Sequence, residues 1–531
     1  MKKIRKEKQP INFILQNHVS LIAFIGLNII LLSIIFVYIL PDYPTGWDAP
    51  YYISRIQYFL EQDVLSNRVG LILLVSTLHL LTGISVISLI TFVPVVATTL
   101  LALASALLAS RVAKNNKFIF PLVFFFVFWS TSYFALSIST IDNAIGLSFA
   151  IFSLYLLSFG MNSIKKIIPF TLSATMVVLT HFESYMLLLL CLFFYFVILL
   201  IQEKSIKTLI KNTWRGIVAI VVTMAIAYFQ WSNIISNITN RYTQEGDSAG
   251  NASIPYADTT SFEQVWKYFS NGLSSAIEIF LFLFGISFVI WSIFRKKSNK
   301  AGHILAFVLS CYSILLFSII RSSIPINRSL LLLPVTLMVS IGMVAVYKFI
   351  KTRFKVSMQL LVIAGLITVM FPISNYIEYV MRFPQSIRQE TYVGLNQLNQ
   401  HVQEENIKNY IVVTNTGSKV KAASAYYGLW RNWIMSVLPL PTESNNFCIY
   451  FGKLDNFRKK EATIRKDNEE YNYISQYSLE CINELPSGTP IYMIKGLYPG
   501  SFPQEGSRFS TKDISENVVE IIWSDNSIGQ L

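Results

Sequence analysis

Charged residues are scarce in this sequence. Asp, Glu, Lys and Arg make up 14% of its 531 residues, whereas hydrophobic types make up 53%. A soluble globular domain carries about 25% charged residues, so this composition excludes an ordinary water-soluble protein. The mean hydropathy of +0.50 points the same way. We therefore expect an α-helical polytopic membrane protein.

Cysteine is also rare, with four residues in the chain. Cys191 and Cys311 lie in apolar runs, where a thiol is a small buried group. Cys448 and Cys481 lie in the more polar C-terminal part, and their spacing neither requires nor excludes a disulfide. An internal repeat of fixed period is also missing from the sequence.

Long apolar runs are the main feature of the sequence. A helix needs about 20 apolar residues to cross a bilayer. About eleven runs meet this requirement, at 20–40, 84–110, 117–137, 142–160, 166–182, 184–202, 215–235, 273–294, 302–321, 327–347 and 356–378. A further run, Val69 to Leu81, is short and is interrupted by His79.

The basic residues decide how these runs are arranged. The net charge is +13, and Lys and Arg gather at 2–8, 111–117, 165–166, 204–215, 295–300 and 348–355. All these clusters face the cytoplasm if Val69 to Leu81 does not cross the membrane, as the positive-inside rule requires. The positive charge therefore indicates topology and a lipid bilayer as partner, and we expect no nucleic-acid partner.

This topology defines three parts of the chain. We expect a cytoplasmic basic tail at 1–19, a transmembrane domain at 20–382 with outer loops at 41–83 and 236–272, and a soluble extracytoplasmic domain at 383–531. The first outer loop is expected to carry membrane-parallel helices. The first span has no small-residue cleavage site after it, so we expect a retained anchor in a multi-pass protein of the plasma membrane.

The last part of the chain has the pattern of an α/β domain. Helical stretches are expected at 386–404 and 419–435. Strand-like runs recur at Tyr410 to Thr414, Phe447 to Phe451, Pro490 to Ile494 and Val518 to Trp523.

Ionisable side chains at membrane depth are costly and commonly face a partner or a functional site. On the expected topology they gather at the outer ends of the spans. Asp48 precedes Ala49-Pro50 and is either a helix N-cap or a site acid at the lipid–water boundary. Asp142 begins a span, where it either opposes the helix dipole or takes part in a site.

Other candidates lie on the same expected side. His181 and Glu183 interrupt the join of two spans. Arg321 and Arg328 lie near the outer end of a late span, where a guanidinium either grips a phosphate or reaches lipid headgroups. Tyr52 and Arg55, on the helix that follows Asp48, are further candidates for substrate binding. That helix is expected to bury Ala49, Tyr52, Ile53, Ile56, Phe59 and Leu60 and to expose Ser54, Gln57 and Glu61.

The order of these features resembles the GT-C glycosyltransferase superfamily. The resemblance covers residues 20–378 and includes the early Asp in Trp47-Asp48-Ala49, the later Asp in Ile141-Asp142-Asn143, and Thr180-His181-Phe182-Glu183. It implies transfer of a sugar, with inversion, from a polyprenyl-phosphate donor to an acceptor glycan, lipid or protein on the outer face. By position, Asp48 matches the catalytic base, Asp142 the second-loop acid, and Arg328 a residue for the donor phosphate.

The sequence also departs from the pattern of that superfamily. Many members have a second acid beside the first Asp, but here the neighbours are Trp47 and Ala49. The Trp-Trp-Asp tripeptide of oligosaccharyltransferases is missing, which disfavours a peptide acceptor. Asp48 and Asp142 are candidates for holding a divalent cation, Mg or Mn, although Asp142 is followed by Asn143 and no cofactor is certain.

Three alternatives remain open at the level of sequence. A lipid-linked polysaccharide polymerase or ligase uses similar donors and about a dozen spans, but tends to place Arg and His in a late outer loop. A transporter or flippase predicts internal repeats and charges near mid-membrane. An inactive GT-C scaffold is the third.

Overall fold

The computed structural model of the chain is mostly helical, with one small sheet. It describes residues 18–39, 49–62, 69–112, 119–129, 137, 141–159, 163–203, 214–231, 276–294, 302–311, 313, 337–339, 341–343, 345–346, 349, 389–414, 434, 437–438, 446–451, 485–486, 488–494 and 509–523. The chain divides into two units. The first comprises Met1–Leu40, Phe92–Ser236 and Thr259–Phe383, and the second comprises Pro41–Thr91, Asn237–Asp258 and Pro384–Leu531.

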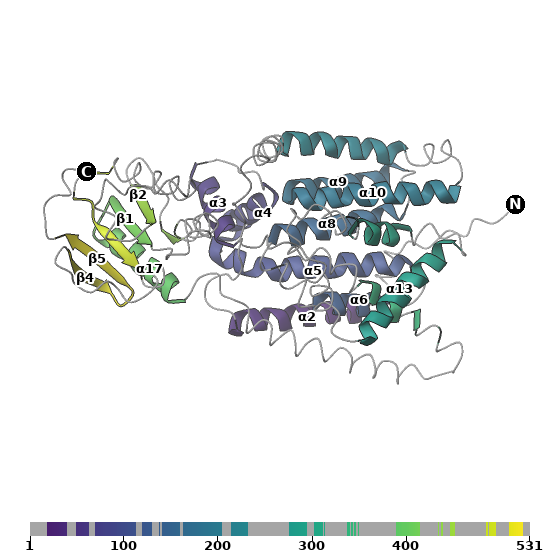
Figure 1. The fold of residues 1–531 in the computed structure, drawn as a ribbon, viewed down its shortest axis with the longest axis horizontal. Helices are drawn as coiled ribbons and strands as arrows, with labels where there is room; N and C mark the ends of the chain where they lie inside the picture. The colour runs from purple at the N-terminus through teal and green to yellow at the C-terminus, as the bar shows by residue number, and fades with distance from the viewer. Residues whose placement is uncertain are drawn as a thin grey trace, which may run out of the picture. The chain divides into compact units, whose positions relative to one another are not determined.

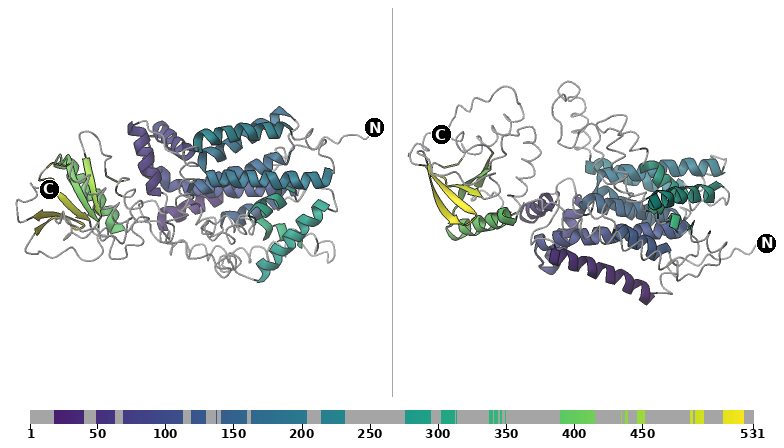
Figure 2. Two further views of the ribbon diagram at one scale, coloured as in Figure 1. Left: turned by 45° about the horizontal axis from the view of Figure 1, so that its top comes forward. Right: turned by 60° about the horizontal axis from the view of Figure 1, so that its bottom comes forward.

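The first unit is a bundle of apolar helices in which α5, α8, α9 and α10 run roughly side by side (Figures 1 and 2). Its described helices match the expected apolar runs in position. They are α2 (His18–Ile39), α5 (Val86–Val112, which begins in the second unit), α6 (Ile119–Phe128), α8 (Ile141–Leu157), α9 (Ile164–Thr180), α10 (Phe182–Glu203) and α13 (Ala276–Phe294), with further helices at Trp214–Trp231 and Gly302–Cys311.

Within the described ranges, three helices are long and apolar enough to cross a membrane. They are Val86–Arg111, Ser184–Ile201 and Trp214–Trp231. Large apolar side chains such as Ile22, Val221 and Phe229 are exposed on the bundle, as a lipid-facing surface requires. The chain is therefore an integral membrane protein. The total of about eleven spans stays a prediction, because several of the expected runs lie partly or wholly outside the described residues.

Small and polar residues hold the helices of the bundle together. The Ser153 hydroxyl bonds the Ser173 hydroxyl at 2.9 Å, and Ser173 also donates to the Phe149 carbonyl at 3.0 Å, which ties α8 to α9. Trp129 donates its indole N–H to Asn28 on α2 at 2.7 Å. Hydrogen bonds and close contacts of this kind replace the hydrophobic driving force that lipid removes between transmembrane helices.

The second unit contains two helices from the segment predicted as the first outer loop, α3 (Ala49–Gln62) and α4 (Val69–Thr82). Ala49, Tyr52, Ile53 and Ile56 on α3 are completely buried and Glu61 is exposed, as the sequence predicts. Ser54 was expected on the exposed face, and this expectation is wrong. Its side chain is buried. Burial is tolerated because the hydroxyl donates a hydrogen bond to the Tyr51 carbonyl at 3.0 Å, in place of a bond to water.

The C-terminal part of the second unit is a mixed sheet with the order β2-β1-β3-β5-β4. Its strands are β1 (Asn409–Thr414), β2 (Asn446–Phe451), β3 (Ile491–Ile494), β4 (Phe509–Ser515) and β5 (Val518–Trp523). β1 pairs in parallel with β2 and β3, whereas β5 pairs antiparallel with β3 and β4. Helix α17 (Gln389–Glu404) packs against β3, β4 and β5 (Figure 2).

Aromatic side chains form the centre of this sheet. Tyr410 stacks on Phe447 with ring centroids 5.4 Å apart, and Tyr410 and Tyr492 are each 1% exposed. Burial raises the pKa of the Tyr410 hydroxyl above its ordinary value. Cys448 on β2 is disulfide-bonded, whereas Cys191 and Cys311 are free thiols buried among helices. Cys481 and nearly all of the expected helix at 419–435 lie outside the described residues.

Candidate active site

His181 is the residue at which one helix ends and the next begins. α9 ends at Thr180 and α10 starts at Phe182, so His181 is the C-cap of α9, with extended backbone angles (φ −153°, ψ 120°). It also occupies the N-cap position of α10, because its ring Nδ1 accepts the backbone N–H of Ser184 at 3.2 Å. The Ser184 hydroxyl lies 3.1 Å from the same nitrogen. The first turn of α10 therefore fixes the orientation of the ring.

The same contact determines which ring nitrogen carries hydrogen. A nitrogen that accepts a backbone N–H bond has no hydrogen of its own. We therefore assign the neutral ring of His181 a hydrogen on Nε2. This hydrogen is on the side of the ring opposite α10.

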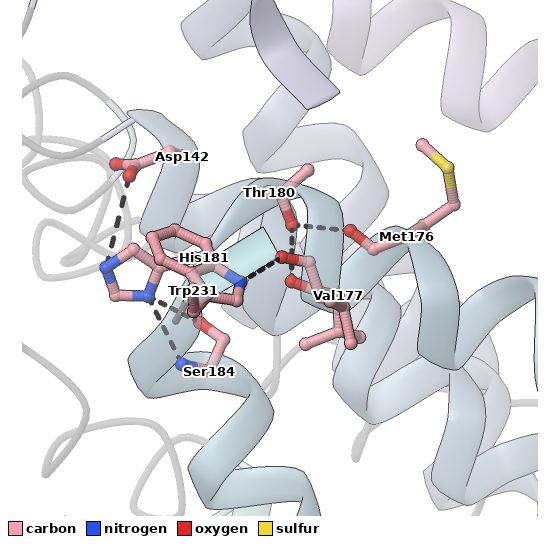
Figure 3. Close-up of polar contacts among 8 residues, drawn as sticks. Asp142, Met176, Val177, Thr180, His181, Ser184 and Trp231 are labelled. Atoms are coloured by element: carbon pink, nitrogen blue, oxygen red, sulfur yellow. Dashed lines mark hydrogen bonds and ion pairs between the residues drawn. The ribbon is translucent and has the colours of Figure 1, made fainter. Parts of the chain in front are cut away.

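Asp142 faces this second nitrogen from the first turn of α8. Its Oδ2 lies 3.9 Å from His181 Nε2, an ion-pair distance, and the two side chains are 1% and 5% exposed (Figure 3). A buried carboxylate is costly unless a partner compensates its charge. The Nε2 atom of His181 and the first turn of α8 both lie beside the Asp142 carboxyl group.

A glycine makes this close approach possible. Gly146 lies one turn after Asp142 on α8, and a Cβ atom placed there would come within 3.0 Å of the His181 Cβ and 3.1 Å of the Ser184 side chain. Any larger residue would push the α9–α10 junction away from α8. Asn143, beside Asp142, is also buried, and its Oδ1 has no hydrogen-bond partner in the part of the chain that the structure describes.

A tryptophan supports the junction from the helix Trp214–Trp231. The Trp231 indole (Figure 3) donates to the Val178 carbonyl at 2.9 Å. Its ring centroid lies 5.7 Å from that of Phe182. Val178 is in the last turn of α9, where carbonyls have no partner within the helix. In the same turn, the Thr180 hydroxyl donates to the Met176 carbonyl at 2.7 Å. The junction is thus held by side-chain bonds on both of its helices.

The structure brings together two of the predicted site residues, Asp142 and His181, both in the first unit. Tyr52 and Arg55 belong to the second unit: Tyr52 is completely buried, and Arg55 is exposed with its guanidinium 5.4 Å from the Tyr51 ring centroid. The backbone of Glu183 is part of α10. Asp48, Arg321 and Arg328 lie outside the described residues.

Two residues of the site were not predicted from the sequence. Ser184 follows His181 by three positions, the spacing at which a capping residue meets the helix backbone, so this signal was present. Gly146 gave no comparable signal, because a glycine in an apolar helix has no distinctive pattern until its neighbours are known.

The described residues do not form a metal-binding cluster. Among them no group of three or more His, Cys, Asp or Glu side chains comes together. Asp142 and His181 provide at most two ligands, and the Nε2–H of His181 faces the carboxylate rather than joining it around an ion. We therefore derive no chemical step through a metal.

Comparisons with known proteins give the class of fold. No protein-family model and no curated protein matches the chain. The apo oligosaccharyltransferase from Archaeoglobus fulgidus matches it with a TM-score of 0.52 at 12% identity, over 89% of this chain and 69% of that one. The form of that protein in complex with Zn and sulfate matches with a TM-score of 0.51 at 13% identity, over 89% of this chain and 68% of that one.

A second known structure matches along its whole length. Apo ArnT from Cupriavidus metallidurans has a TM-score of 0.51 at 9% identity, over 96% of this chain and 100% of that one. Both proteins are GT-C glycosyltransferases. The chain therefore shares the fold of these two glycosyltransferases, as the sequence resemblance predicts.

Proposed function

We propose that this protein is a membrane glycosyltransferase that moves a sugar from a polyprenyl-phosphate donor to an acceptor on the extracytoplasmic face. The observation that carries the proposal is the buried pair of Asp142 and His181 at one end of a helical bundle with the GT-C fold. A carboxylate held at the end of apolar helices is suited to chemistry on a lipid-linked substrate, whose reacting group lies at the membrane surface.

The proposed topology follows the distribution of charge. Arg111 and Lys166 lie around the C-terminal end of α8, opposite the end that carries Asp142. Basic residues favour the cytoplasmic side, which supports an outer position for Asp142. The N-terminal tail 1–19 is then cytoplasmic, and the soluble domain 383–531 and the loops 41–83 and 236–272 are extracytoplasmic.

The proposed reaction is a single displacement. An acceptor hydroxyl oxygen attacks the anomeric carbon, the bond between that carbon and the phosphate oxygen breaks, and the phosphate leaves with the electron pair. Asp48 takes the proton of the hydroxyl as general base, and attack from the face opposite the phosphate inverts the configuration of the anomeric carbon. Arg328 and Arg321 stabilise the charge that develops on the leaving phosphate.

Asp142 orients the reacting groups in this proposal. Its carboxylate accepts a hydroxyl hydrogen of the acceptor or of the sugar, and Asn143 Oδ1 supplies a second acceptor beside it. Both side chains are shielded from water, which strengthens their electrostatic contacts with a substrate.

The test is a transfer assay with the purified full-length chain in lipid nanodiscs. A panel of radiolabelled polyprenyl-phosphate sugars serves as donors, and an extract of envelope lipids and glycans serves as the acceptor pool. We expect one donor to support transfer by the wild type and Asp48→Asn to abolish it, while Asp63→Asn, an acid in the same outer loop, retains activity. Transfer by Asp48→Asn would refute its role as base. Movement of an unchanged donor across the membrane, without transfer, would indicate a flippase.

A further inference from the structure

The ring of His181 makes more contacts than a helix cap requires. Capping α10 needs only one acceptor atom, and Nδ1 provides it to the N–H of Ser184. Asn and Ser are good N-caps with shorter side chains and fewer atoms. The second nitrogen, Nε2, has no role in the cap, and it lies 3.9 Å from Asp142 Oδ2.

We propose that His181 is a positioning residue that fixes the direction of the Asp142 carboxylate through its Nε2–H. The proposal rests on the proposed function, in which Asp142 orients a reacting group. The first turn of α10 holds Nδ1, the rigid ring places Nε2 on the opposite side, and Nε2–H restrains the carboxylate. The backbone of α10 thus sets the orientation of a side chain on α8.

Burial makes this restraint effective. The side chains of Asp142 and His181 are 1% and 5% exposed. Charge–dipole contacts are several times stronger in a water-poor interior than at a surface. The separation of 3.9 Å exceeds a hydrogen bond, and such contacts often shorten when the substrate binds. Gly146 has no side chain between α8 and the α9–α10 junction. A small movement that shortens the contact between Asp142 and His181 is therefore not blocked at this position.

Two substitutions separate the cap from the contact with Asp142. His181→Asn keeps an acceptor near the position of Nδ1 but has no atom that reaches Asp142. His181→Gln places an amide N–H near the position of Nε2 but caps the helix poorly. A structural role predicts that Asn preserves function and Gln does not. The positioning role predicts the reverse order in activity.

We expect His181→Asn to fold, with an unfolding temperature lowered by the loss of the Asp142 contact but not by the loss of the cap, and to lose about 10 to 100-fold in kcat, with a smaller change in KM. His181→Gln is expected to unfold at a lower temperature yet to retain kcat within about threefold of the wild type. Near-wild-type kcat for His181→Asn, or equal losses in both variants, would overturn the proposal. If the Asn variant does not fold, His181→Ser replaces it. If neither short variant folds while Gln does, the contact with Asp142 serves the fold rather than catalysis, and the proposal fails.

A second measurement works without any substrate. In a double-mutant cycle of His181→Asn and Asp142→Asn, the shifts in unfolding temperature should not add, because each change removes the same contact. Additive shifts would overturn the inference whether or not the wild type transfers sugar. A wild type that uses no donor, combined with non-additive shifts, would instead refute the proposed function and leave the contact established.

Discussion

The two ends of α8 differ in the sign of their charged residues and in how deeply these residues are buried. At the C-terminal end, Arg111 donates to the Ser158 hydroxyl at 3.0 Å and to the Ser158 carbonyl at 3.3 Å, and Lys166 donates to the Phe159 carbonyl at 2.8 Å. Both cations are half-buried. At the N-terminal end, Asp142 is buried and faces His181, which lies at the junction of α9 and α10.

We interpret the difference as one between charge that stabilises a helix and charge that serves the proposed reaction. Cations at a helix C-terminus form hydrogen bonds with its last carbonyls and interact favourably with its dipole. The Cζ atom of Arg111 also lies 3.9 Å from the centroid of the Phe159 ring. Nothing in that arrangement needs to be buried. The Asp142 pair is shielded and requires a glycine for its approach, so its burial is a cost that local stability does not explain. The following predictions test this contrast.

The largest expected effect is that of Asp142→Asn. This change removes the negative charge from the buried end of α8 while keeping the shape of the side chain. We expect kcat to fall by about 100-fold or more, as when a group that orients the reacting atoms is lost. The transfer assay measures this, with the exposed Glu61→Gln on α3 as control. A kcat within about threefold of the wild type would mean that the two ends of α8 do not differ in function.

Gly146→Ala should have the next largest effect. The added methyl group would come within 3.0 Å of the His181 Cβ, so the α9–α10 junction must shift by a few tenths of an ångström. We expect a loss of about 10-fold in kcat. Gly26→Ala is the matched control, since Gly26 lies on α2 with nothing within 4 Å of the new methyl group. Equal activity in the two variants would show that the close approach has no role in transfer.

Trp231→Phe should affect stability more than activity. The indole N–H that bonds the Val178 carbonyl disappears, and the buried carbonyl loses its partner. The free energy of unfolding is expected to fall by about 1 to 2 kcal/mol. Thermal unfolding in detergent checks this, with Tyr228→Phe at an exposed position of the same helix as control. An unchanged unfolding temperature would mean that water or another donor replaces the indole.

Arg111→Gln should have the smallest effect. The helix end loses a cation and a ring contact, which costs about 1 kcal/mol or less in the free energy of unfolding. We expect kcat to stay within about twofold of the wild type, because Arg111 lies at the end of α8 opposite to the site. A loss of tenfold or more in kcat would break the contrast between the two ends.

The apolar runs and the strand-like runs predicted much of the observed secondary structure. Buried strands rich in β-branched and aromatic residues, β1 and β5 among them, are recognisable from sequence. β4 was not predicted. Among the described strands it lies at the edge of the sheet, beside β5, and its residues Ser510, Lys512 and Asp513 are exposed, so its sequence shows no apolar alternation.

The candidate site was predictable in its residues but not in its geometry. Asp142 and His181 stand out because charged groups are rare in apolar helices. Their meeting depends on how α8 packs against the α9–α10 junction, which hydrophobic periodicity does not encode. Tyr52 illustrates the converse: its place on the buried face of α3 was predicted, whereas a role in binding substrate stays a prediction.

The direct join of α9 to α10 also determines where the chain accepts extra residues. Each residue of an α-helix turns it by about 100°, so one amino acid inserted next to His181 would rotate all of α10 about its axis. The Tyr185 hydroxyl, 3.0 Å from the Thr223 hydroxyl, would then face another direction. Natural variation in length is therefore expected elsewhere in the chain, and a library of single insertions should find this position among the least tolerant.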